Sequence, residues 1–115
     1  MPSETPEIGT SVLGDTELVE KAGNAANGRK FKLLFEEGWE STVIKRVYDT
    51  PRRARLALVN HLVWWTRHDI AQVRRLFKQS ALCTDELIQY REYYTELVQS
   101  ALSLLGDECY NPNHS

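Results

Sequence analysis

The sequence contains little cysteine and no long apolar run, and these two features exclude several classes of protein. Two cysteines among 115 residues are too few for a disulfide-stabilised scaffold. No stretch of about 18 apolar residues occurs, so we expect no membrane span. The first residues lack a basic segment followed by an apolar one, so we expect no secretory signal. These observations favour one small domain with free thiols in the cytoplasm.

Motifs for metal binding and covalent catalysis are also missing. The histidines and cysteines form no CxxC, HxxxH or HExxH arrangement, so we expect no protein-bound metal. Cys83 and Cys109 flank an expected helix of roughly 30 Å, which is too long for a disulfide to bridge. There is no GxSxG nucleophile motif and no glycine-rich phosphate loop. We therefore expect no enzyme activity from this domain alone.

Charge is distributed unevenly along the chain. Residues 21–78 hold 13 of the 14 lysines and arginines but only five acids, whereas residues 1–20 hold five acids and no base. The net charge of −2 therefore hides a strongly basic middle segment. Such a segment is typical of a surface that binds a polyanion, and solvated helix faces are the alternative.

Apolar residues at helical spacing predict an all-α fold, a compact bundle of about five helices. Asp15, Thr50 and Thr84 are expected N-caps. Gly38 and Gly106 are expected to end helices, the second of them a long C-terminal one. The expected helices cover 15–26, 28–36, 51–65, 70–79 and 85–105.

The expected domain organisation is a flexible leader over 1–14, a helix-bundle domain over 15–106 and a flexible tail over 107–115. Residues 39–49 have strand-like composition, but the sequence offers no partner strand. We therefore expect an irregular connection there.

Basic residues with aromatic residues between them predict a groove for single-stranded DNA, because phosphates pair with cations and bases stack on aromatic rings. Three arginines fall in the first turns of a predicted helix, where each cation opposes the helix dipole by about 0.3–1 kcal/mol. An incoming anion would relieve that repulsion. The predicted DNA contacts are Arg29, Lys32, Trp39, Arg46, Tyr48, Arg52, Arg53, Arg55, Arg74, Arg75, Lys78 and Gln79.

Some aromatic residues have a structural alternative. Trp39 fits a core position beside Gly38 as well as it fits a stacking role. At least one of the tandem Trp64 and Trp65, in the middle of a predicted helical pattern, is expected to pack in the core, and His61 is expected to be buried and hydrogen-bonded.

Several motifs occur in a recognisable order: Asn27-Gly28-x-Lys30-Phe31, Leu62-x-Trp64-Trp65-Thr66, Asp69-Ile70-x-Gln72-Val73 and Leu76-Phe77-x-Gln79-Ser80-Ala81-Leu82. With the apolar residues around them, from 18 to 82, they resemble the helix-bundle domain that follows the catalytic core in primase-polymerases of archaeal plasmids and some phages. The resemblance implies one domain of an archaeal plasmid replication protein, next to a catalytic primase-polymerase domain in the same chain and with a helicase part. It also implies that the domain holds the single-stranded template and a nucleotide while primer synthesis begins. The segments before Ala54 and after Leu82 depart from the family pattern.

The predicted nucleotide contacts are Asn27, Gly28, Lys30 and Ser80, with ATP or another nucleoside triphosphate as the ligand. Lys30, Gln79 and Ser80 are the polar positions that match the family motif. Two other functions stay open. One is a protein-docking bundle that uses the acidic last helix with Tyr90, Tyr93 and Tyr94. The other is a helix-turn-helix that binds duplex DNA through 51–65 and 69–79.

Overall fold

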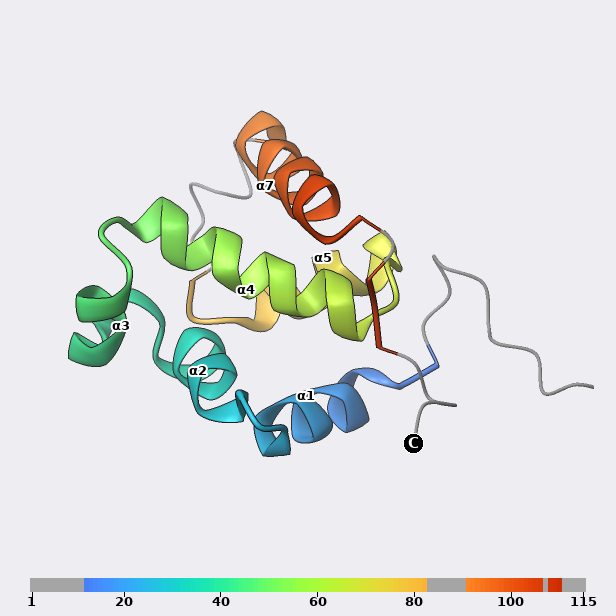
Figure 1. Cartoon of the computed structure of the whole chain (residues 1–115), viewed down its shortest axis with the longest axis horizontal. Helices are drawn as coiled ribbons and strands as arrows, with labels where there is room; N and C mark the ends of the chain where they lie inside the picture. Colours follow the sequence, from blue (N-terminus) through green and yellow to red (C-terminus); the bar gives the residue numbers. More distant parts are fainter. Residues whose placement is uncertain (1–11, 83–90, 107, 111–115) are drawn as a thin grey trace, which may run out of the picture.

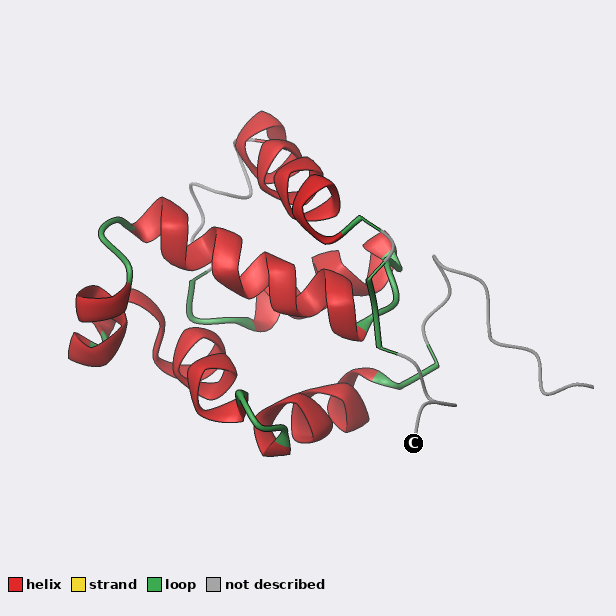
Figure 2. Cartoon of the chain, in the orientation of Figure 1, coloured by secondary structure: helices red, strands yellow, loops and turns green. Residues whose placement is uncertain are grey.

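Every regular element of the described chain is helical. The computed structural model describes residues 12–82, 91–106 and 108–110, and these ranges contain helices and no strand (Figure 1, Figure 2). The α-helices are α1 (Asp15–Asn24), α2 (Gly28–Lys32), α3 (Thr42–Val47), α4 (Pro51–Trp65), α5 (Ile70–Gln79) and α7 (Arg91–Leu105). A π-helical turn, Leu33–Glu37, extends α2, and a 3-10 turn, Gly38–Glu40, precedes α3. The predicted all-α class is confirmed, and none of the described helices is long and apolar enough to cross a bilayer.

The central helix of the bundle is α4. It lies between α7 on one side and α1 with α2 on the other, and α5 also packs against it (Figure 1). Its buried residues recur at helical spacing: Ala54, Leu58, Val59, Leu62, Val63 and Trp65. They form one core with apolar side chains from α1, α2, α5 and α7. Burial of a side chain such as leucine contributes about 1.5–3 kcal/mol, so α4 supplies much of the stabilisation.

Two predicted helix starts are confirmed by side-chain caps. The Thr50 hydroxyl oxygen accepts a hydrogen bond from the Arg53 N–H at 3.2 Å, and Pro51 follows at the first helical position. The Asp69 carboxylate accepts one from the Gln72 N–H at 3.3 Å, which starts α5. The Thr50 cap was predicted from the sequence, whereas at Asp69 only the start of the helix was predicted and the cap was not.

Residues 39–49 differ from the predicted irregular connection, because they contain the 3-10 turn and α3. Ser41 caps α3 by accepting a hydrogen bond from the Ile44 N–H at 3.3 Å. Ile44 is the buried residue of this helix, whereas Val43 and Val47 are 38% and 47% exposed. The β-branched composition therefore hid a short capped helix that packs through one side chain.

Gly38 ends the second helical segment, as predicted. Its φ is 63°, a conformation that favours glycine. A Cβ added at Gly38 would lie 2.9 Å from the Cβ of Ala81. The Ala81 N–H also donates to the carbonyl of Phe35 at 2.8 Å. These contacts join the end of the π-helical turn to the residues that follow α5.

The start of α1 differs from the prediction that Asp15 is its N-cap. Gly14 takes that position, and the Asp15 carboxylate instead accepts hydrogen bonds from α5, from Gln72 at 2.9 Å and from Arg75 at 3.2 Å. Leu13, which we expected in the flexible leader, is buried, and its carbonyl accepts a hydrogen bond from Gln72 at 2.8 Å. The chain therefore packs on the bundle from Leu13 onward, because Gln72 of α5 binds the Leu13 carbonyl as well as the Asp15 carboxylate.

The helix α4 ends in a turn with two left-handed residues, Arg67 at φ 57° and His68 at φ 65°. The Arg67 N–H donates to Trp64 at 3.2 Å, and the His68 N–H donates to Val63 at 2.9 Å. This is the Schellman pattern, in which glycine usually occupies the position that Arg67 holds. A left-handed conformation costs a non-glycine residue roughly 1–2 kcal/mol, so other contacts must stabilise this turn.

Residues 108–110 provide those contacts, although we expected them in a flexible tail. The Tyr110 ring stacks on Trp65 with centroids 5.0 Å apart, and the Tyr110 N–H donates to the Trp64 carbonyl at 2.9 Å. The buried Arg67 guanidinium donates to the Tyr110 carbonyl, and the His68 ring N–H donates to the carbonyl of residue 108 at 2.9 Å. Residues 108–110 are thus packed against partners that lie about 40 positions earlier in the chain, which their composition did not indicate.

Other predictions fall on the ends of segments. Gly106, at φ 58°, follows the last residue of α7, which confirms the predicted end of that helix. The predicted cap at Thr84 lies outside the described residues, and so do residues 1–11, 107 and 111–115 of the leader and tail.

Candidate nucleic-acid interface

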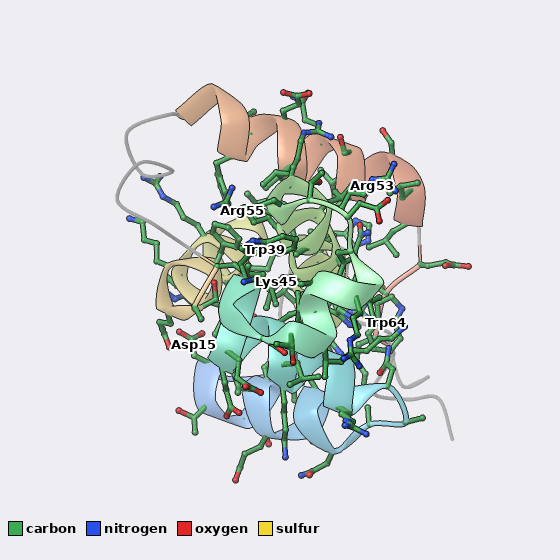
Figure 3. The ribbon with its side chains drawn as sticks, turned by 90° about the vertical axis from the view of Figure 1, so that its left-hand side faces the viewer. Asp15, Trp39, Lys45, Arg53, Arg55 and Trp64 are labelled. Carbon is green, nitrogen blue, oxygen red and sulfur yellow. The ribbon has the colours of Figure 1, made fainter. Side chains whose placement is uncertain are left out.

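Several predicted DNA contacts lie at the end of the molecule formed by α3, the 3-10 turn and the start of α4. In Figure 3 this end faces the viewer, with Trp39, Lys45 and Arg55 near its middle, Arg53 toward α7 and Asp15 toward α1. Arg55 is half-buried, and its Nε donates to the carbonyl of Leu82 at 3.2 Å. Arg55 therefore ties α4 to the segment after α5, which is a structural role.

Three of the predicted DNA-contacting arginines form ion pairs. The pairs are Arg52–Glu96 at 3.0 Å, Arg53–Asp49 at 3.4 Å and Arg75–Asp15 at 3.2 Å. Exposed pairs of this kind contribute about 0–1 kcal/mol each. Hydrogen bonds from Arg75 and then Gln72 hold the pKa of Asp15 below its usual value, while partial burial opposes them. Arg52 and Arg53 oppose the helix dipole in the first turn of α4, and their ion pairs with Glu96 and Asp49 offset that repulsion.

Other cations are exposed and form no ion pair with any residue that the structure describes. They lie on α2, α3 and α5: Arg29, Lys30, Lys32, Lys45, Arg46, Arg74 and Lys78. Lys32 lines a cleft of about 270 Å³ between α1 and α2, beside Val19 and Phe35. Lys45, which the sequence did not single out, lies on α3 next to the predicted Arg46.

Trp39 and Tyr48 flank α3 and are both half-buried against the core. Burial raises the pKa of the Tyr48 phenol above its usual value. Each ring therefore packs on the protein with one part while the rest meets solvent. A ring held in this way loses little conformational freedom when a base stacks on it.

The expectation that at least one of the tandem tryptophans packs in the core is confirmed by Trp65, and His61 is half-buried. Trp65 is buried, Trp64 is half-buried, and their rings meet edge to face with centroids 4.8 Å apart. His61 packs edge-on against Phe31 at 5.9 Å. Burial, followed by the nearby charge of Lys30, lowers the pKa of His61.

The four predicted nucleotide contacts do not form one open site. Gly28 is buried, and a Cβ added there would lie 2.0 Å from the carbonyl oxygen of Gly23. Ser80 is buried as well, and its hydroxyl donates to a carbonyl of α5 at 2.7 Å. Asn27 and Lys30 are exposed at the start of α2. The glycine therefore serves close packing of α1 and α2, which a short motif cannot distinguish from a phosphate-binding turn.

Sequence reasoning missed Arg67 and Tyr110, which organise the far end of α4. The only available signal was an aromatic residue in an otherwise polar tail. Within the ranges that the structure describes, no three histidine, cysteine or acidic side chains come together as a metal site.

Comparison with known families agrees with this architecture. The family described as NrS-1 polymerase HBD domain matches residues 52–112, more than half of the chain. The matched segment contains α4, α5, α7 and the packed residues 108–110. No curated protein and no solved structure matches the chain. The chain therefore belongs to the NrS-1 polymerase helix-bundle domain family, the domains that follow the catalytic core of primase-polymerases.

Proposed function

We propose that this domain binds the single-stranded DNA template of a primase-polymerase and performs no chemistry itself. The observation that carries the proposal is the group of exposed cations on α2, α3 and α5 that form no ion pair with a described residue. The end of α5 meets the π-helical turn through the Ala81–Phe35 hydrogen bond, so Lys78 and Trp39 come from adjoining segments. Trp39 and the cation Lys45 lie close together at the end of the molecule that faces the viewer in Figure 3, which supports the proposal.

This arrangement suits a flexible polyanion. Each phosphate that a lysine or arginine contacts releases counterions, which gives affinity that falls steeply as salt rises. A base that stacks on a ring such as Trp39 adds about 1–3 kcal/mol without requiring a particular sequence. Gln79 at the end of α5 and Arg74 in its middle are both exposed, and side chains of these types hydrogen-bond base edges and add sequence preference.

We further propose that ATP or another nucleoside triphosphate binds together with the template. Lys30 and Asn27 are the exposed members of the predicted set, and they lie at the start of α2. In the full protein, the partner of this complex would be the catalytic primase-polymerase domain of the same chain, with a helicase part elsewhere. The domain would then hold template and nucleotide while primer synthesis begins.

Fluorescence anisotropy with labelled single-stranded oligonucleotides, at two salt concentrations and with or without ATP, tests this proposal. The double variant Lys45→Gln/Arg46→Gln should weaken binding and reduce the slope of log affinity against log salt by about 0.7 per lost phosphate contact. Lys21→Gln, which removes one exposed cation on α1, is the control for loss of charge, and its Tm is measured as well because Lys21 lies over the Tyr110 ring. If binding did not depend on salt, or if the α3 and Lys21 variants lost equal affinity per removed charge, α3 would not be part of the DNA-binding surface.

Two other functions have specific support and predict different results. The α4–turn–α5 unit exposes Arg74 and Lys78 on its second helix, as a duplex reader would. Tighter binding to duplex than to single strands would favour that function. Exposed Val43 and Val47 on α3 favour protein docking. The absence of any DNA binding at low salt would support docking.

A further inference from the structure

The ion pairs of the basic surface are of two kinds. The Asp15 carboxylate is 30% exposed and is held by the side-chain amide of Gln72 as well as by two nitrogens of Arg75. Glu96 and Asp49 are 64% and 80% exposed. Among the described residues, each of these two carboxylates bonds only to its arginine.

The two exposed carboxylates occupy positions that a phosphate would take. The guanidinium donors that bind a carboxylate also bind a phosphate oxygen, with similar geometry. Glu96 meets Arg52 through one contact at 3.0 Å, and Asp49 meets Arg53 through one contact at 3.4 Å. Single exposed contacts of this type are weak, so a ligand that carries several phosphates can displace them.

We propose that Glu96 and Asp49 are internal competitors for the template phosphates, and that DNA reaches Arg52 and Arg53 by exchanging phosphate for carboxylate. This inference rests on the proposed single-stranded DNA binding. Arg52 and Arg53 both lie in the first turn of α4, so one strand that passes around the start of this helix can contact both arginines and replace both carboxylates. A single inorganic phosphate gains one contact while it displaces one, which gives it little net advantage. The two acids therefore make the surface prefer a ligand with several phosphates over a single inorganic phosphate.

The Asp15–Arg75 pair behaves differently. Its carboxylate has a second fixed partner in Gln72, and the pair joins α1 to α5. Displacement of Asp15 would leave the Gln72 amide without one of its acceptors. Arg75 therefore stays on Asp15 when DNA binds, and its predicted role as a DNA contact becomes a structural one.

Anisotropy titrations of a fluorescein-labelled single-stranded oligodeoxynucleotide test the exchange. Glu96→Gln should tighten binding about two- to fivefold, since an exposed ion pair contributes up to about 1 kcal/mol. Glu37→Gln is the control, because Glu37 is an exposed acid on the π-helical turn with no ion pair to a described residue. Asp49→Asn should tighten binding in the same way at the second pair, where the carboxylate comes from the segment before α4 and not from α7. Inorganic phosphate, added as a competitor, should release little DNA from the wild type.

A double-mutant cycle separates exchange from a general loss of negative charge. In an Arg52→Gln background, Glu96→Gln should no longer tighten binding, because the competed arginine is gone. An equal gain in both backgrounds, or equal gains for Glu96→Gln and Glu37→Gln, overturns the exchange and leaves the proposed function intact. No salt-sensitive binding by the wild type overturns the proposed function and the exchange with it.

Discussion

Replacement of Tyr110 by alanine tests whether the packed tail residues hold the end of α4. The ring stacks on Trp65 at 5.0 Å and meets Trp64 edge-on at 5.9 Å, and Lys21 lies over it at 5.9 Å. Aromatic pairs contribute about 0.5–1.5 kcal/mol each, and an exposed cation–π contact contributes about 0.5–1 kcal/mol. Tyr110→Ala should therefore lower the free energy of unfolding by about 1.5–4 kcal/mol. The backbone hydrogen bonds of residue 110 remain possible in this variant.

Thermal and urea unfolding, followed by circular dichroism, measure this loss. For a domain of this size, the expected fall in Tm is about 4 °C per kcal/mol, which gives roughly 6–16 °C. Near-ultraviolet circular dichroism should change as well, because the two tryptophans lose an aromatic neighbour. Tyr110→Phe is the control, since it keeps the ring and should change Tm by only a few degrees. If Tyr110→Ala and wild type unfold within about 2 °C of each other, the tail does not stabilise α4.

Four further predictions concern single substitutions. Asp15→Asn should lower stability at pH 7, and this effect should shrink only as the pH falls from about 4 through the lowered pKa of Asp15, because a lowered pKa stabilises the fold while the carboxylate stays ionised. Urea unfolding at pH 7 and at several values below about pH 4 checks this. Lys30→Gln should raise the pKa of His61 toward 6.5 in an NMR titration, since the nearby cation helps to lower it. Because folded His61 resists protonation, stability should fall as pH drops below about 6.5, and His61→Phe should flatten that fall. Gly28→Ala should destabilise the domain by about 3 kcal/mol or prevent folding, because its Cβ would overlap backbone; equilibrium unfolding measures this loss.

The parts of the fold that sequence predicted are those with local signals. Thr50 bonds to the N–H group three residues ahead, and Gly38 has the positive φ that ends a helix. The apolar face of α4 follows helical spacing along a single segment. Each of these features depends on residues within a few positions of one another, so a pattern search can find them.

The parts that sequence missed depend on distant partners. Asp15 is a good cap by type, but its carboxylate is used by Arg75, which lies 60 residues away. Residues 108–110 have a tail-like composition, yet they pack on the turn after α4. The helix α3 was missed for another reason, because its exposed valines suggested a strand and a single buried Ile44 gives no periodicity.

For the candidate site, the sequence predicted which segments carry cations better than it predicted which of those cations are free to contact DNA. Arg29, Lys32, Arg46, Arg74 and Lys78 are exposed, as a binding surface requires. Composition could not show which arginines are already used, since Arg52 pairs with Glu96, 44 positions later. It also could not show that Gly28 and Ser80 are buried, because that depends on how α1 and α5 pack.

The basic character of residues 21–78 therefore overstates the charge that a DNA strand can meet. Arg67 is buried and bonds to the Tyr110 carbonyl, Arg55 bonds to the Leu82 carbonyl, and Arg75 is fixed by Asp15. These three cations hold separate segments together, so they add little to phosphate binding. The salt dependence of DNA binding should accordingly be shallower than a count of all 13 bases implies, because each phosphate contact requires an accessible cation. If carboxylate and phosphate exchange at Arg52 and Arg53, the plot of log affinity against log salt becomes steeper when Glu96 and Asp49 are neutralised. That change distinguishes the number of cations that DNA can reach from the total number of cations in the segment.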